Sequence, residues 1–177
     1  MLTPEQEKWV SHLNTTGRVE IFLYDEKAPE KFEQIKAQIQ SAIGADFEIL
    51  HRGASSMGIS GQKEIDVYIP ISAEQIEVLT PKMEAVFGKP KSVYTNERTK
   101  FLANVDGTKI EIMLTNKEHP SWINGEKFRD CLLANPETLE RYKKLKEECA
   151  GVNCQQYYRK KIEFINEILG EDYIRYE

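Results

Sequence analysis

The stretch from residue 51 to residue 71 constrains this 177-residue chain more than any other part of it. Its first half is small and polar, with three glycines and three serines, and its second half is a β-branched run that predicts a strand. Side chains alternate along a strand, so Glu64, Asp66 and Tyr68 share one face, and isoleucine and valine share the other. Because two carboxylates on a core strand are costly without a cation nearby, this stretch predicts a site as well as a strand.

The composition excludes several classes of protein. An apolar fraction of 40% is sufficient for a core, and a net charge of -5 argues against binding duplex nucleic acid through bulk charge. The three cysteines, Cys131, Cys149 and Cys154, match neither a disulfide framework nor a zinc-site spacing. The first residues lack a charged leader with an apolar segment, and no apolar run is long enough to span a membrane. We therefore expect a cytoplasmic protein with reduced thiols and no membrane partner.

The hydrophobic spacing along the rest of the chain predicts alternating helices and strands. Helices are expected over residues 4–15, 29–43, 73–87, 120–134, 136–149 and 154–169, and short strands over residues 18–24 and 46–51. Thr3 before Pro4, Ser72, and Asn135 before Pro136 are typical residues at helix starts.

The clearest supersecondary signal is a β-hairpin. Residues 98–105 and 108–114 alternate in polarity and are joined by Asp106-Gly107, the dipeptide typical of a type I′ turn. We expect the second strand of this hairpin to lie beside the strand at 64–70, which would bring Glu111 near Asp66.

These elements predict an α+β fold. We expect a mixed β-sheet with helices packed on one face and a C-terminal helical subdomain closing over the other, with the site between them. The expected parts are an N-terminal helix (1–17), an α/β core (18–116) and the helical subdomain (117–177). The oligomeric state does not follow from the sequence.

The central stretch resembles the signature of the nucleotidyltransferase superfamily. A small turn at Gly53-Ala54 is followed, after nine residues, by Glu64-Ile65-Asp66-Val67, and Glu111 on a later strand stands where that superfamily has its third carboxylate. The chain departs from the signature in having Ala54 where a second glycine or a serine is usual, and Glu64 where an aspartate is usual.

Most of the chain also resembles the GrpB family within that superfamily. The matching stretches are Tyr24-Asp25 with Pro29 and Phe32; His51 and Gly53 through Lys63 to Ile65-Asp66; Phe128-Arg129-Asp130 through Asn135-Pro136 to Tyr142 and Leu145-Lys146; and Tyr157 with Lys161, Phe164 and Ile165.

The resemblance implies magnesium-dependent transfer of a nucleotidyl group from a nucleoside triphosphate to an acceptor that the sequence does not identify. It implies Asp66, Glu111 and Glu64 as catalytic residues and as ligands of Mg²⁺, which prefers hard oxygen ligands. The residues expected to contact the nucleotide are Gly53, Ser55, Ser56, Lys63, Arg129 and Lys161.

Other interpretations remain open at this point. The acidic residues also suit a solvated strand face paired with Lys63 and Lys109, and the Gly/Ser segment suits a tight turn. Arg129 suits an anchor of the helical part, and Lys161 an exposed helix face. For the whole chain, the alternatives are a decayed module that binds a nucleotide, a coenzyme fragment or a partner protein without chemistry, and a purely structural interaction protein.

Overall fold

The computed structural model describes residues 1–174, which form two compact units. The sheet unit consists of residues 24–59 and 63–123, and the helical unit of residues 1–23, 60–62 and the part from Asn124 onward. The division expected from the sequence, with borders after residues 17 and 116, remains a prediction. Among the described residues, no helix has the length and apolar character needed to cross a membrane.

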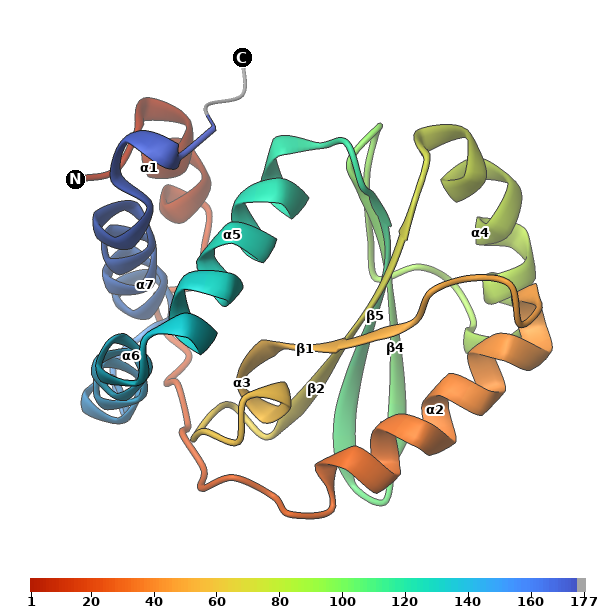
Figure 1. Cartoon of the computed structure of the whole chain (residues 1–177), viewed down its shortest axis with the longest axis horizontal. Coiled ribbons are helices and arrows are strands. Elements are labelled where there is room, and N and C mark those ends of the chain that lie inside the picture. Colours follow the sequence, from red (N-terminus) through yellow and green to blue (C-terminus); the bar gives the residue numbers. More distant parts are fainter. Residues whose placement is uncertain (175–177) are drawn as a thin grey trace. The chain divides into compact units, whose positions relative to one another are not determined.

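The sheet unit is built on a five-stranded mixed sheet. Its strands are β1 (Leu50–Arg52), β2 (Glu64–Ile71), β3 (Ser92–Tyr94), β4 (Arg98–Val105) and β5 (Thr108–Asn116). They lie in the order β1-β2-β5-β4-β3 (Figure 1). β2 and β5 are parallel, whereas the other neighbouring pairs are antiparallel. The predicted α+β fold with a mixed sheet is therefore confirmed.

One face of this sheet is covered by the helices α2 (Ala28–Ile43) and α4 (Ala73–Phe87), as Figure 1 shows. Every second residue of β2 is buried in this core, and the same alternation in β4 and β5 contributes Phe101, Ile110 and Ile112. Because successive side chains of a strand point to opposite faces, the polar residues of β2 are left for the other face.

The hairpin of β4 and β5 forms as predicted, with a two-residue turn. Asp106 and Gly107 have φ values of 48° and 74°, and positive φ at both central residues is the mark of a type I′ turn. The start of β5 is also tied to α2, because the buried Lys31 Nζ donates to Thr108 Oγ1 at 2.7 Å and to Asp25 Oδ2 at 2.6 Å. Lys31 therefore links Asp25, which lies just before α2, to the first residue of β5.

Several local expectations were wrong. Residues 18–24 make isolated bridges in place of a strand, since Arg18 pairs with Asn153 and Phe22 with Gly61, which both lie in loops. The strand expected at 46–51 is reduced to β1, and the Gly/Ser loop after it forms the one-turn helix α3 (Gly53–Ser56). The edge strand β3 was not foreseen, because three residues are too few to show a period.

The helical unit holds α1 (Pro4–Ser11), α6 (Pro136–Glu148), α7 (Cys154–Leu169), the single turn η1 (Gly170–Asp172) and most of α5 (Pro120–Ala134). The three C-terminal helices match the predicted ranges to within one residue, whereas α1 ends four residues before the predicted end at residue 15. Their core contains the rings of Phe128, Tyr142 and Phe164, with centroids 5.2–6.1 Å apart.

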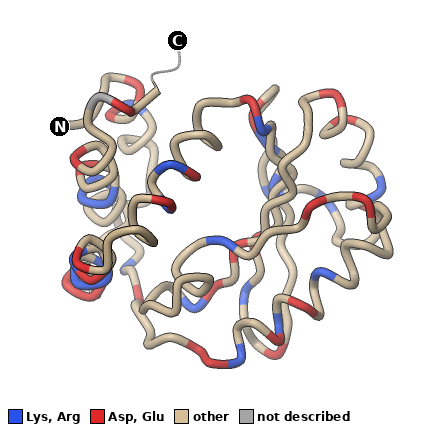
Figure 2. Tube along the Cα trace, in the orientation of Figure 1, with Lys and Arg blue, Asp and Glu red and all other residues tan. Residues whose placement is uncertain are grey.

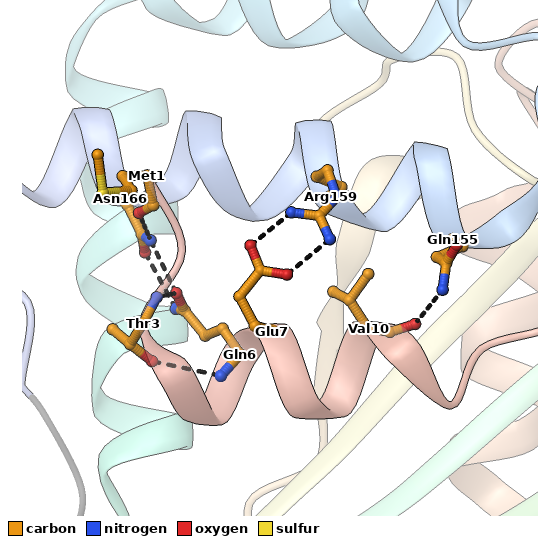
Figure 3. Close-up of polar contacts among 8 residues, drawn as sticks. All are labelled: Met1, Thr3, Gln6, Glu7, Val10, Gln155, Arg159 and Asn166. Carbon is orange, nitrogen blue, oxygen red and sulfur yellow. Dashed lines mark hydrogen bonds and ion pairs between the residues drawn. The ribbon is translucent and has the colours of Figure 1, made fainter.

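Polar side chains fasten α1 to α7 within the helical unit (Figure 3). The carboxamides of Gln6 and Asn166 bond to each other in both directions, at 3.1 and 2.9 Å, and Gln6 is 8% exposed. Glu7 and Arg159 form an exposed bidentate ion pair at 2.5 and 2.6 Å, and Gln155 donates to the Val10 carbonyl at 3.3 Å. The polar contacts between α1 and α7 therefore include a partly buried amide pair, an exposed ion pair and a bond from Gln155 to the α1 backbone.

Candidate functional site

Glu64 and Asp66 of β2 and Glu111 of β5 lie on the sheet face opposite α2 and α4, and these three residues are called the carboxylate face. Asp66 is the direct partner of Glu111 in the parallel ladder, and Glu64 is the partner of Lys109. Direct partners in adjacent strands have side chains on the same face of a sheet. The prediction that 108–114 lies beside 64–70, with Glu111 next to Asp66, is confirmed.

Gly53 packs directly against the Asp66 carboxylate. Its φ is +70°, and a Cβ built on it would lie 1.9 Å from Asp66 Oδ2 and 2.9 Å from Asp66 Cγ. Both the left-handed backbone and the close approach require glycine at this position. The turn that begins α3 therefore packs closely against the Asp66 carboxylate of β2.

Two lysines form ion pairs with the Glu64 and Glu111 carboxylates of this face. Lys109 Nζ lies 2.6 Å from Glu64 Oε2 and 3.0 Å from Glu111 Oε1, and Lys100 Nζ lies 3.0 Å from Glu111 Oε2. The sequence had left Lys109 open as an ion-pair partner, and the contact from Lys100 on β4 was not foreseen. Figure 2 shows Lys and Arg interspersed with Asp and Glu along the chain.

These contacts shift the protonation equilibria of the partners. Partial burial favours a lower pKa for Lys109, but the carboxylates of Glu64 and Glu111 outweigh it and raise this pKa above its ordinary value. Burial favours a higher pKa for Glu111, but Lys109 and Lys100 outweigh it and hold this pKa below its ordinary value. Lys109 and Glu111 are therefore charged near neutral pH.

The donor chemistry of the face fits Mg²⁺, although the side chains are not gathered around a metal position. Within residues 1–174, no group of three or more His, Cys, Asp or Glu side chains is arranged to hold a metal ion. Asp66 and Glu111 offer the hard oxygens that Mg²⁺ prefers. A metal on Glu111 would have to displace an ammonium group from it, because each of its oxygens has a lysine within 3.0 Å.

The serines of α3 make bonds inside the sheet unit. Ser55 Oγ is 2.9 Å from His51 Nε2, and Ser56 Oγ donates to the Gly53 carbonyl at 2.8 Å. His51 is the ladder partner of Val67, so it lies on the helix-covered face, where its ring stacks on Phe32 at 4.9 Å. Burial, helped by the nearby charge of Arg52, lowers the pKa of His51 to about 4, so this imidazole is neutral at physiological pH.

The remaining predicted residues lie at other places. Lys63 precedes β2 with a left-handed φ of 57°. Arg129 and Lys161 belong to the helical unit. There Arg129 Nη1 is 3.5 Å from Asp130 Oδ1 while its buried Nε has no hydrogen-bond partner within the described residues, and Lys161 Nζ is 5.5 Å from the Tyr158 ring centroid.

An aromatic contact beside the carboxylate face was missed by sequence reasoning. The Tyr68 ring of β2 lies 5.4 Å from the Trp122 ring of α5, and the Arg52 guanidinium lies 5.8 Å from the same Trp122 ring. Strand alternation places Tyr68 on the face of Asp66, and Arg52 is the direct partner of Asp66 in β1. The alternation was visible in the sequence, but the contact with α5 was not.

Comparisons with known proteins agree with this fold. A family model described as GrpB protein matches residues 18–171. A UPF0157 protein of Vibrio cholerae serotype O1 is 27% identical over 135 residues, which cover 74% of this chain and 70% of that protein. The crystal structure of the conserved protein GrpB from Enterococcus faecalis superimposes with a TM-score of 0.65, covering 87% of this chain and 99% of that one, at 16% identity. At that identity, the structural likeness speaks for the fold alone.

Proposed function

The chain belongs to the GrpB family, and from this premise we propose that its carboxylate face binds a nucleoside triphosphate with Mg²⁺ and transfers the nucleotidyl group to an acceptor hydroxyl. The observation that carries the proposal is the position of Asp66, which has the Gly53 turn against its carboxylate and Glu111 as its direct neighbour. A small turn, a strand carboxylate and a second strand carboxylate are the combination that the nucleotidyltransferase superfamily uses.

In this proposal the carboxylates bind the metal, and the residues of the turn and Lys63 contact the phosphates. Asp66 and Glu111, with Glu64, would hold Mg²⁺, which when bound stabilises negative charge on the attacking and leaving oxygens. Gly53 allows the backbone of α3 to approach the phosphates closely, and Lys63 before β2 would neutralise their charge. Ser55 and Ser56 would contact phosphate only after giving up their bonds to His51 and to the Gly53 carbonyl.

The proposed transfer step forms one bond to phosphorus and breaks another. The acceptor oxygen forms a bond to the α-phosphorus, the bond from that phosphorus to the bridging oxygen breaks, and pyrophosphate leaves. A carboxylate of the face that Mg²⁺ does not saturate would accept the proton of the acceptor hydroxyl. Arg129 and Lys161, which belong to the helical unit, stay predicted nucleotide contacts that this proposal does not use.

A second candidate function is favoured by the lysine contacts. Lys109 joins Glu64 to Glu111, and Lys100 takes the other oxygen of Glu111, so the face is already largely neutralised by side chains. Such a face suits a module that binds a nucleotide, a coenzyme fragment or a partner protein without performing chemistry.

A ligand series separates these candidates. Thermal and urea unfolding are measured with each of the four common nucleoside triphosphates at millimolar concentration, with Mn²⁺ or Mg²⁺ and with chelator. Binding to the native state alone stabilises it by about 2.7 kcal/mol at a hundredfold excess over Kd. We expect this gain to require the metal and to be lost in Asp66→Asn, while Lys117→Met, which changes an exposed lysine next to the opposite end of β5, retains it.

Turnover then decides between transfer and binding. Metal-dependent binding with pyrophosphate release in the presence of a hydroxyl acceptor supports the transferase. Binding without release from any acceptor tested supports the binding module. Absence of stabilisation by all four triphosphates would contradict the proposal that this face is a nucleotide site.

A further inference from the structure

The Lys109 ammonium lies between two acidic side chains that come from different strands. It is 2.6 Å from Glu64 Oε2 on β2 and 3.0 Å from Glu111 Oε1 on its own strand, β5. We propose that Lys109 is the resident counter-cation of the carboxylate face, and that a divalent metal binds Glu64 and Glu111 only in competition with it.

The competition follows from the atoms that the ammonium uses. A metal shared by Glu64 and Glu111 would need a carboxylate oxygen from each of them, and Lys109 already contacts one oxygen of each. The ladder favours this contact, because Lys109 is the direct partner of Glu64 and is two residues from Glu111 on the same strand face. The Lys109 ammonium and a metal ion would therefore compete for the same position between the two carboxylates.

Lys100 differs from Lys109 in a way that can be tested. Its Nζ reaches Glu111 Oε2 at 3.0 Å from β4, which is not the neighbour of β2 in the sheet. It reduces the charge of one carboxylate without joining two. Removal of Lys100 therefore frees one oxygen of Glu111, whereas removal of Lys109 frees the position between the two carboxylates.

The Lys109 contact is suited to exchange. Its side chain is 48% exposed, compared with 18% for Glu64 and 17% for Glu111, so the ammonium can leave for water while the carboxylates stay in place. Ion pairs with this degree of exposure contribute little net stability, which keeps displacement within reach of a divalent cation. The inference rests on the proposed function only for the identity of the competing ion, since the contacts themselves are independent of any nucleotide.

The test measures binding of Mn²⁺ alone, by the loss of the free-ion signal in electron paramagnetic resonance, with no nucleotide present. Lys109→Met keeps the length of the aliphatic stem and removes the ammonium. We expect it to bind Mn²⁺ at least about tenfold more tightly than the parent, a factor that corresponds to 1.4 kcal/mol. Lys100→Met should give a smaller gain, and Lys117→Met, which removes one exposed positive charge from the far end of β5, should give none.

Urea unfolding supplies a second readout. In chelator, Lys109→Met should be slightly less stable than the parent, because two carboxylates have lost their shared cation, and Mn²⁺ should recover the lost stability. If Lys109→Met does not fold, Lys109→Gln, which keeps a neutral hydrogen-bond donor, is measured in its place.

The outcomes distinguish this inference from the proposed function. Equal or weaker Mn²⁺ binding by both Lys109 variants would overturn the role of Lys109, even if the parent binds a nucleoside triphosphate. Tighter Mn²⁺ binding by either variant would support that role, even if no nucleotide binds and the proposed function fails. A destabilisation that Mn²⁺ leaves unchanged would mark the contact as a structural ion pair and would also overturn it.

Discussion

Replacement of Gly53 by alanine tests the fit between the α3 turn and Asp66. The new methyl group would lie 1.9 Å from Asp66 Oδ2 and 2.9 Å from Asp66 Cγ, far inside contact distance. Alanine would also have to adopt a φ of +70°. The variant therefore meets two independent penalties, one from the backbone of residue 53 and one from the side chain of residue 66.

Both penalties have known magnitudes. A left-handed backbone costs a residue other than glycine about 1 kcal/mol. Forcing a methyl group into filled space costs typically about 1–3 kcal/mol. We therefore expect Gly53→Ala to lower the free energy of unfolding by about 2–4 kcal/mol.

A double-mutant cycle separates the two parts. Asp66→Ala removes the carboxylate, so Gly53→Ala in that background should retain only the backbone cost of about 1 kcal/mol. The four proteins are compared by urea unfolding, with the m value as a check that the unfolded states are alike. An equal loss from Gly53→Ala in both backgrounds would show that Asp66 does not pack against Gly53, and would remove the observation on which the proposed site rests.

Two further predictions concern other parts of the chain. The His51 pKa is lowered to about 4 from 6.5, so between these values the unfolded state binds more protons and stability falls as the pH falls. Allowing for partial exposure, we expect the parent to lose about 1 kcal/mol more than His51→Gln between pH 7 and pH 5 in urea unfolding, and equal slopes would contradict a buried neutral imidazole. In the helical unit, Gln6→Ala removes both hydrogen bonds between Gln6 and Asn166, leaves Asn166 Nδ2 with the Met1 carbonyl, and should cost about 1–3 kcal/mol, whereas Glu7→Gln weakens only an exposed ion pair with Arg159 and should cost less than Gln6→Ala. The same unfolding assay checks both, and a larger loss from Glu7→Gln would refute this ranking.

The elements that the sequence predicted well are those with local signals. Ser72 caps α4 through a capping box, Asn135 caps α6, and Asp106-Gly107 closes the hairpin. Each of these signals acts over a few residues, so tertiary contacts were not needed to read it. The expectation that Glu111 accompanies Asp66 also predicted that β2 and β5 are neighbours, but it did not predict that the two strands run parallel.

The elements that were missed depend on contacts between distant segments. Residues 18–24 look like a strand, but in the described chain they bridge to Asn153 and Gly61 in loops, where no extended partner is available. α3 forms because Gly53 turns the chain against Asp66, an approach that only the folded neighbours reveal.

In the candidate site too, features set by local sequence were predicted and features set by distant contacts were missed. Alternation along β2 placed Glu64 and Asp66 on one face correctly, because side-chain direction in a strand is a local property. The expectation that Glu111 joins them came from the resemblance to the nucleotidyltransferase signature. Which lysine reaches which oxygen depends on long side chains and on the register of β4, so the Lys100 contact could not be read from the sequence. Ser55 was predicted as a phosphate contact, and its bond to His51 became visible only when α3 was in place.

The central claim is that Asp66 belongs to a metal-dependent nucleotide site, and urea unfolding of the parent and Asp66→Asn tests it most directly. The variant keeps the shape of the side chain and removes one of the three negative charges of the carboxylate face, two of which pair with lysines. It relieves any like-charge repulsion that remains, which is roughly 1 kcal/mol for two charges about 5 Å apart in a water-like dielectric. In chelator, the account predicts that Asp66→Asn is as stable as the parent or more stable. With Mg²⁺ and a nucleoside triphosphate, it predicts the opposite order, because only the parent gains binding energy. A variant that is destabilised by the same amount in both conditions would contradict the account, since Asp66 would then serve the fold and not a ligand.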